Sequence, residues 1–204
     1  MAVASSGTFS TFLVIGGLVS ATLGYMLSTR FGPTPSLGSV TLGITTLTGL
    51  LLSSRGFLDL GFAPATGYLA DRWGRHRMIV GALPVAIVMV GVLALLPPLP
   101  VVMAAVLVMY AAGTTLSVAF NALAGDIVPP AKRRMFLSLF VTCQDLGAAL
   151  GPLLGYWIGP QFGLTWLYLC GVIVLAVASL LYLAAFGSPD RTTTSRHPPV
   201  PEQG

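Results

Sequence analysis

The chain has 204 residues, of which 55% are apolar and only 8% are charged, and its formal net charge is +4. Soluble domains carry charge on roughly a quarter of their residues, so this composition excludes a fold whose exterior faces water. The small net charge is confined to a few short stretches, which excludes a nucleic-acid-binding surface. The two cysteines, Cys143 and Cys170, lie inside apolar runs and indicate neither a disulfide framework nor a metal site.

Six stretches are long and apolar enough to cross a bilayer, which takes about 20 residues of α-helix. In chain order they cover about residues 8–29, 39–65, 78–96, 101–124, 135–158 and 164–186. Links rich in proline, glycine or charge separate them. The sequence therefore predicts an all-α bundle of six transmembrane helices over residues 1–187. A polar tail over 188–204 has too little apolar surface to fold.

The basic residues predict an orientation. Eight of the ten Lys and Arg lie in the second link, the fourth link and the tail: Arg72, Arg75, Arg77, Lys132, Arg133, Arg134, Arg191 and Arg196. The opposite face has only Arg30. The positive-inside rule places both termini in the cytoplasm of a multi-pass protein of the plasma membrane. The first residues lack a basic region, so no cleaved signal peptide is expected.

The link between the second and third helices is dense in charge and glycine. Asp71 is expected to accept hydrogen bonds from free amides at the start of the third helix and to pair with Arg75, four residues on. Gly74 permits a positive φ angle in the turn, and Gly67 lets another helix approach closely. A generic basic loop explains the arginines, but not the glycines and the aspartate at these spacings.

This stretch resembles the loop motif of the major facilitator superfamily, G-x-L-A-D-R-x-G-R-[K/R]-x. The matching positions are Gly67, Leu69, Ala70, Asp71, Arg72, Gly74 and Arg75, with Arg77 completing the basic turn; His76 departs from the pattern. The resemblance implies one six-helix half of a major-facilitator-type fold. It also implies that this loop gates the cytoplasmic side by engaging the opposite half, and that it does not contact the solute.

The fifth helix has a glycine at every fourth position. Gly147, Gly151 and Gly155 form a smooth stripe, and Pro152 removes an amide and favours a bend. This pattern predicts a helix that packs closely and can rock, although ordinary small-residue packing explains it equally well. The run resembles the glycine-proline motif of drug/proton antiporters, except at Tyr156, and so favours export.

Ionisable and amide side chains within the spans are candidates for binding solute or protons. Arg55 and Asp59 share one face of the second helix, and they serve either transport or as a structural pair. Asp145 lies near the middle of the fifth helix and suits proton loading, with Gln144 beside it. Asn121, on the fourth helix, suits an interhelical hydrogen bond.

The sequence thus predicts a permease half, more like a C-terminal half, that moves a small solute by alternating access, with proton-coupled export. Its partners would be the lipid bilayer, the solute, a proton or other coupling ion, and a second six-helix half in a homo- or heterodimer. A truncated, transport-inactive membrane scaffold is the alternative. The acids are isolated and no phosphate-binding loop is present, so no enzyme activity, cofactor, metal or nucleic acid is expected.

Overall fold

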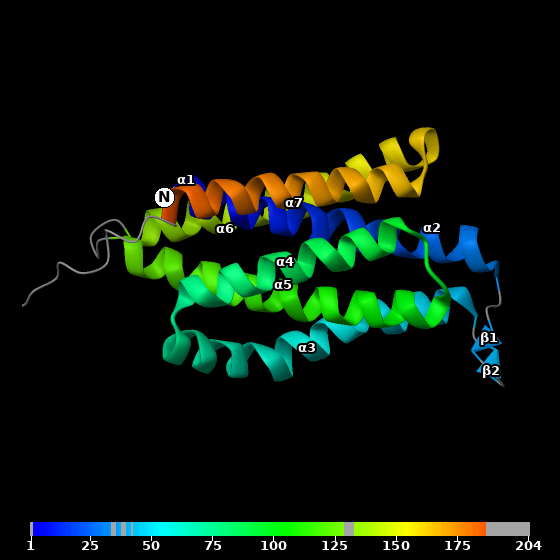
Figure 1. Ribbon diagram of the computed structural model, residues 1–204, viewed down its shortest axis with the longest axis horizontal. Coiled ribbons are helices and arrows are strands. Elements are labelled where there is room, and N and C mark those ends of the chain that lie inside the picture. The colour runs from blue at the N-terminus through cyan, green and yellow to red at the C-terminus, as the bar shows by residue number, and fades with distance from the viewer. Residues whose placement is uncertain (1, 34–35, 38–39, 42, 129–132, 187–204) are drawn as a thin grey trace, which may run out of the picture.

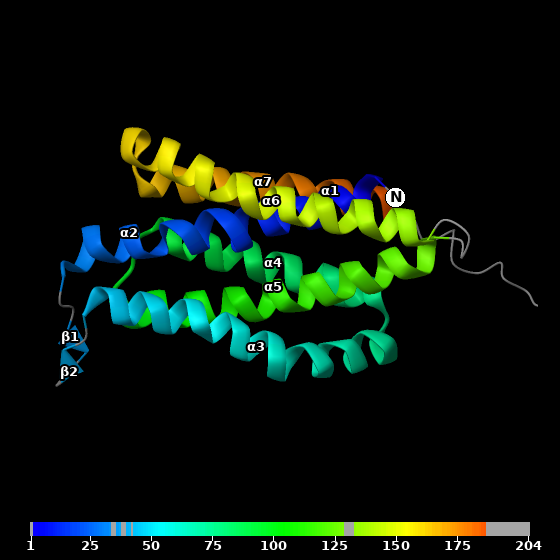
Figure 2. The ribbon, with the colours of Figure 1, turned by 180° about the vertical axis from the view of Figure 1, so that it is seen from behind.

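The computed structural model describes residues 2–33, 36–37, 40–41, 43–128 and 133–186 as a bundle of long helices that run side by side (Figures 1 and 2). The first span has three sections, α1 (Ala2–Thr11), the π-helix η1 (Phe12–Val19) and α2 (Ser20–Phe31). A short antiparallel hairpin follows, formed by β1 (Ser36–Leu37) and β2 (Val40–Thr41). The remaining helices are α3 (Ile44–Trp73), α4 (Arg75–Ala94), α5 (Leu99–Ile127), α6 (Arg133–Phe162) and α7 (Leu164–Phe186). The predicted tail over 188–204 lies outside the described residues.

Five of the helical segments are long and apolar enough to cross a membrane: Ala4–Phe31, Arg75–Ala94, Leu99–Asp126, Arg133–Phe162 and Leu164–Phe186. The sixth predicted span, α3, is not among them, although it is 30 residues long and packs against α5, from which its C-terminal part diverges (Figure 2). Its hydropathy is lowered by Arg55, Asp59 and several hydroxyl residues. The all-α bundle is therefore confirmed, with one helix more polar than the others.

Two predicted starts and two predicted ends of helices are wrong. The first span was expected to begin near residue 8 and the second near residue 39, but α1 begins at Ala2, and Val40–Thr41 form β2, so that α3 begins only at Ile44. The second span was expected to end near residue 65, but α3 continues through the charged motif to Trp73, and the chain turns only at Gly74, which has φ 91°. The fifth span was expected to end near residue 158, but α6 continues through Pro160 and ends before Gly163, which has φ 88°. Polar residues and a late proline do not stop a helix whose remaining backbone bonds form; a left-handed glycine does.

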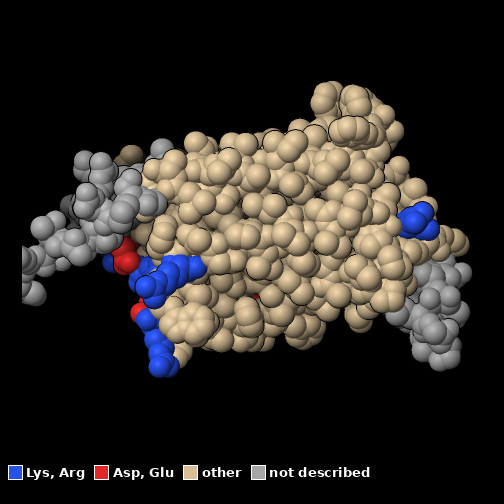
Figure 3. Space-filling view, in the orientation of Figure 1, with Lys and Arg blue, Asp and Glu red and all other residues tan. Residues whose placement is uncertain are grey.

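The helices pack as two connected groups. The first span packs chiefly against α6, while α4 packs against α5 and α7, and α5 also packs against α3. Large aromatic side chains are fully buried between them: Tyr110, Phe120, Phe140, Tyr168 and Tyr182. The outer surface is apolar, with Phe57 75% and Leu60 80% exposed. On the face seen in Figure 3, basic side chains gather at one end, a single one lies at the other, and the surface between them is mostly uncharged, as a bilayer requires.

Candidate functional site

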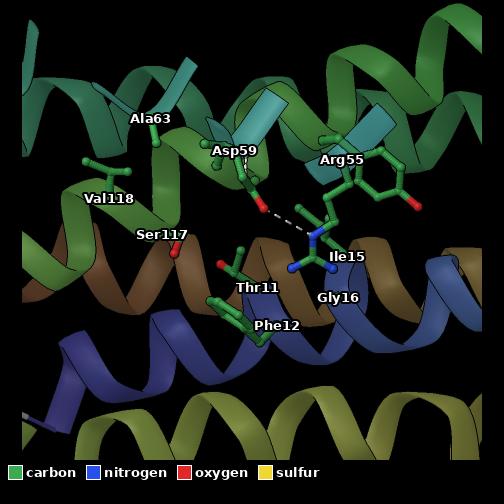
Figure 4. A pocket seen from close by; sticks show the side chains of 12 residues that line it. Thr11, Phe12, Ile15, Gly16, Arg55, Asp59, Ala63, Ser117 and Val118 are labelled. Carbon is green, nitrogen blue, oxygen red and sulfur yellow. Dashed lines mark hydrogen bonds and ion pairs between the residues drawn. The ribbon is translucent and has the colours of Figure 1, made fainter. Parts of the chain in front are cut away.

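A cavity of about 260 Å³ lies between the first span, α3 and α5 (Figure 4). Its apolar lining includes Phe12 and Ile15 from η1 and Val118 from α5. Its polar lining comes from all three helices: Thr11, Arg55, Asp59, Tyr110, Thr114 and Ser117. A cavity with this mixture of apolar walls and a few polar groups is typical of a small-molecule site.

Arg55 and Asp59 extend from α3 toward the first span (Figure 4). Nε of Arg55 lies 3.9 Å from Oδ2 of Asp59, as their spacing of four residues on a helix allows. Thr114 on α5 donates a hydrogen bond to Oδ1 of Asp59 at 2.5 Å. The side chains of Arg55 and Asp59 are 35% and 50% exposed, so this ion pair remains accessible from the cavity.

The π-helix η1 forms one wall of the cavity. Just after it, the Ser20 hydroxyl donates to the carbonyl oxygen of Ile15, five residues earlier, and lies 3.1 Å from the hydroxyl of Tyr110. π-helical turns are rare and occur mostly at functional sites. Sequence reasoning singled out none of the hydroxyl residues Ser20, Tyr110 and Thr114. Neutral hydroxyls within apolar runs carry no signal until a partner helix is placed beside them.

Two further predicted residues meet next to this cavity. Gln144 on α6 donates a hydrogen bond to the side-chain oxygen of Asn121 on α5 at 3.3 Å. Asn121 in turn donates to the carbonyl of Ser117, which lines the cavity. Gln144 is buried. The hydrogen bond between the two side-chain amides joins α5 and α6 beside the cavity, and neither residue lines the cavity.

Asp145 is not part of this group. Its side chain is exposed, and within the described residues it has no hydrogen bond or ion pair. Ser138 and Thr142, seven and three residues earlier, are also exposed and share its side of α6 at helical spacing. This polar stripe, Ser138–Thr142–Asp145, lies within a helix that is otherwise suited to lipid.

The turn between α3 and α4 is held by Arg75. Its Nη1 donates to the carbonyl oxygen of Ala122 at 2.7 Å and pairs with Asp126, both near the end of α5. Asp71 lies 3.6 Å from Nη2 of Arg75. The sequence predicts that Asp71 accepts hydrogen bonds from the first amides of α4, and this is wrong. Asp71 lies in the last turn of α3, and Gly74 occupies the capping position of α4.

The other motif residues differ in exposure. Arg72 and Arg77 are exposed, while Gly67 and Leu69 are half-buried. The nearest atom to a Cβ placed on Gly67 would be Cγ1 of Val118, at 4.0 Å. His76, the departure from the family pattern, stacks on Tyr182 of α7, and its Nδ1 lies 3.1 Å from the Tyr182 hydroxyl.

The glycines of α6 face the first span. A Cβ on Gly151 would lie 2.4 Å from the Cα of Gly17 in η1, and a Cβ on Gly147 or Gly155 would lie 2.7 Å from atoms of α1 or α2. Pro152 lies within the helix, which continues on both sides of it. The stripe brings the two backbones into direct contact, as small residues do between membrane helices.

Among the residues that the structure describes, no three His, Cys, Asp or Glu are placed to hold a metal ion. The ionisable groups of the cavity are instead an arginine and an aspartate that face each other.

Comparisons with known proteins agree with the fold. Residues 7–203 match the family described as the Major Facilitator Superfamily. Two solved structures of a mutant of the peptide transporter POT, one with alafosfalin and one with sulfate, superpose with a TM-score of 0.71 at 20% sequence identity. They align with 90% of this chain, which spans 37% and 36% of theirs.

A curated relative matches over a shorter stretch. The staphylopine export protein of Staphylococcus aureus strain Mu50 is 38% identical over 58 residues, which are 28% of this chain and 15% of that protein. The chain therefore spans well under half the length of the proteins that it resembles. The family match over nearly the whole sequence, the apolar helices and the shared fold lead to one conclusion: the chain belongs to the Major Facilitator Superfamily and is a multi-pass membrane protein.

Proposed function

We propose that the chain is one six-helix lobe of a secondary transporter and that a small solute binds in the cavity between the first span, α3 and α5. The observation that carries this proposal is the Arg55–Asp59 pair, which faces that cavity from near the middle of α3. Ionisable groups inside a membrane are costly and are retained where they contact a solute, an ion or each other.

The α3–α4 turn would act as the cytoplasmic gate in alternating access. Arg75 ties this turn to Asp126 and Ala122 at the end of α5, so the turn and α5 would move as one unit. Arg72 and Arg77 are exposed beside it and would meet the opposite lobe. In this proposal the basic turn and both chain termini lie in the cytoplasm and the protein lies in the plasma membrane, which the positive-inside rule supports for the orientation.

A second six-helix lobe, either another copy or a different chain, would complete the transporter. The Ser138–Thr142–Asp145 stripe supports this, because the Asp145 carboxylate would be unfavourable if it faced lipid, whereas the Thr142 hydroxyl already donates to the carbonyl of Ser138. In the assembled protein Asp145 would load and release the coupling proton, and transport would run outward.

Reconstitution tests the proposal. Proteoliposomes containing the purified chain, alone and with a candidate second lobe, are loaded with a defined mixture of small metabolites, and a pH gradient is imposed. Mass spectrometry should show saturable, gradient-dependent loss of at least one solute. The variants Asp71→Ala and Arg75→Ala should alter this rate.

Arg134→Ala is the matched control, since Arg134 is exposed at the same end of the bundle and has no ion pair or hydrogen bond within the described residues. Absence of flux in every assembly state would overturn the proposal and favour a transport-inactive scaffold.

A further inference from the structure

We infer that the free end of the Arg55 guanidinium binds a carboxylate group of the solute, and that Asp59 and Thr114 position this arginine and do not bind a cation. The inference rests on the proposed function, because it names the chemistry of the solute that the cavity would hold.

The contacts of Asp59 account for both of its oxygen atoms. Oδ1 accepts the hydrogen bond of Thr114 at 2.5 Å, and Oδ2 lies 3.9 Å from Nε of Arg55. A cation beside Asp59 would also lie close to the positive charge of Arg55, which opposes its binding. Its effect is to orient the arginine from the Nε side.

Arg55 is engaged on one edge alone. Within the described residues, its Nη1 and Nη2 make no hydrogen bond or ion pair, although the side chain is 65% covered. These two nitrogens form the end of a rigid fork whose spacing matches the two oxygens of a carboxylate. Arg55 is therefore mostly buried, is held at Nε, and has two terminal nitrogens free to bind an oxyanion.

The first span leaves room for that oxyanion. Nη1 and Nη2 of Arg55 lie 3.6 and 3.7 Å from where a Cβ on Gly16 would be, so the absence of that side chain opens space directly beside the fork. Figure 4 shows Arg55 reaching toward Gly16 and Ile15, with Phe12 on the same wall. The polar end of a solute would meet Arg55 here, and its apolar part would lie against η1.

The charge in the cavity selects the type of anion. Arg55 and Asp59 are the only Asp, Glu, Lys or Arg among its lining residues, and together they are neutral. A bound carboxylate brings the group to a net charge of −1 and a bound dianion to −2, so the dianion leaves more uncompensated charge in the cavity. The site therefore favours a carboxylate over a phosphate or phosphonate dianion.

Binding to the 204-residue chain in lipid nanodiscs tests this without requiring transport. The probes are benzoate, its neutral isostere benzamide and the dianion phenylphosphonate at pH 8, each titrated and followed by ligand-observed NMR. Benzoate should bind saturably, and the other two should bind at least tenfold more weakly. Equal binding of benzoate and benzamide, or preference for the dianion, would overturn the inference.

Three variants locate the binding. Arg55→Gln should weaken benzoate binding about tenfold or more, since a charge-assisted hydrogen bond contributes about 1.5–3 kcal/mol. Asp59→Asn should change benzoate binding less than Arg55→Gln does, because the asparagine oxygen can still accept the Thr114 hydrogen bond and orient Arg55, while the competing negative charge is removed. Should Asp59→Asn lose as much affinity as Arg55→Gln, Asp59 would be a ligand and the assignment would be wrong.

Gly16→Ala tests binding at the two terminal nitrogens of Arg55 and leaves the Arg55–Asp59 ion pair unchanged. It provides a second test if Arg55→Gln fails to fold. The added methyl group makes ordinary contacts with its neighbours, so the fold should persist while benzoate binding falls. Gly56→Ala, one residue from Arg55 with open space at its Cβ, is the control and should bind like the parent. Unchanged binding in Gly16→Ala would contradict the placement of the anion.

The outcomes of the two tests can be told apart. Benzoate binding that depends on Arg55 in a chain without flux would support this inference and reject the proposed transport. Flux of an uncharged solute that is unaffected by Arg55→Gln would support transport and reject the carboxylate.

Discussion

Gly17 of the first span and Gly151 of α6 bring two helix backbones into direct contact: a Cβ on Gly151 would lie 2.4 Å from the Cα of Gly17 and 2.4 Å from the amide nitrogen of Leu18. Backbone atoms cannot move aside as a flexible side chain can. The two helices must therefore separate if either glycine gains a side chain. Gly17 belongs to η1, and another side of η1 faces the cavity.

Gly151→Ala should destabilise the protein by about 1–3 kcal/mol, the usual cost of overpacking a close contact. The free energy of unfolding in mixed detergent micelles measures it. Gly61→Ala is the control, because nothing lies within 4 Å of its Cβ position and alanine favours helix. Equal stability of Gly151→Ala and the parent would show that the two helices are not in backbone contact.

Arg75 should be coupled energetically to Asp126 more strongly than to Asp71. Arg75 pairs with Asp126 and also bonds to the neighbouring carbonyl of Ala122, whereas its contact with Asp71 is 3.6 Å long and the Asp71 side chain is 72% exposed. Double-mutant cycles with alanine should give about 0.5–1 kcal/mol for the Asp126 pair and less for Asp71. The reverse order would mean that the turn is held to α3 and not to α5.

The hydroxyl of Tyr182 should stabilise the start of α4 through His76. Tyr182→Phe keeps the ring that stacks on His76 and packs edge-on against Phe120, but removes the hydrogen-bonding oxygen. We expect a loss of about 1 kcal/mol in unfolding free energy, and little further loss when His76→Ala is added to it. Tyr68→Phe, at an exposed tyrosine, should leave stability unchanged; additive effects of the first two changes would exclude the contact.

Asp145→Asn should leave stability within about 0.5 kcal/mol of the parent, because its exposed side chain has no partner within the described residues. Asp59→Asn should be less stable, since it weakens contacts with both Thr114 and Arg55. In proteoliposomes, Asp145→Asn should abolish the dependence of flux on the pH gradient. A gradient dependence equal to that of the parent would remove Asp145 as the proton carrier.

Much of the fold follows from composition and local pattern. The last span, Leu164–Phe186, agrees at both ends with prediction, because a long apolar run between a left-handed glycine and a polar segment has no alternative in a bilayer. The ends of α3 and α6 did not follow from the sequence. In the sequence, polar residues and Pro160 indicate a loop between helices, but both helices continue through them.

The candidate site was predictable only in part. Charge inside an apolar run marked Arg55 and Asp59, and amide character marked Asn121 and Gln144. Sequence spacing also paired Arg75 with Asp71, which the structure shows at 3.6 Å. Arg75 has two further partners, the carbonyl of Ala122 and the carboxylate of Asp126. These could not be predicted, because both contacts form only when α5 lies beside the turn.

What the sequence by itself determined is the bundle of membrane helices, the glycine turns and the residues too polar to face lipid, because each depends on interactions within one helix or with the bilayer. Only the tertiary structure decided which helices touch: that the glycines of α6 meet η1, that Thr114 bonds to Asp59, and that Gly16 leaves the end of Arg55 open. These contacts join residues tens of positions apart, and their geometry exists only once the helices are packed against one another.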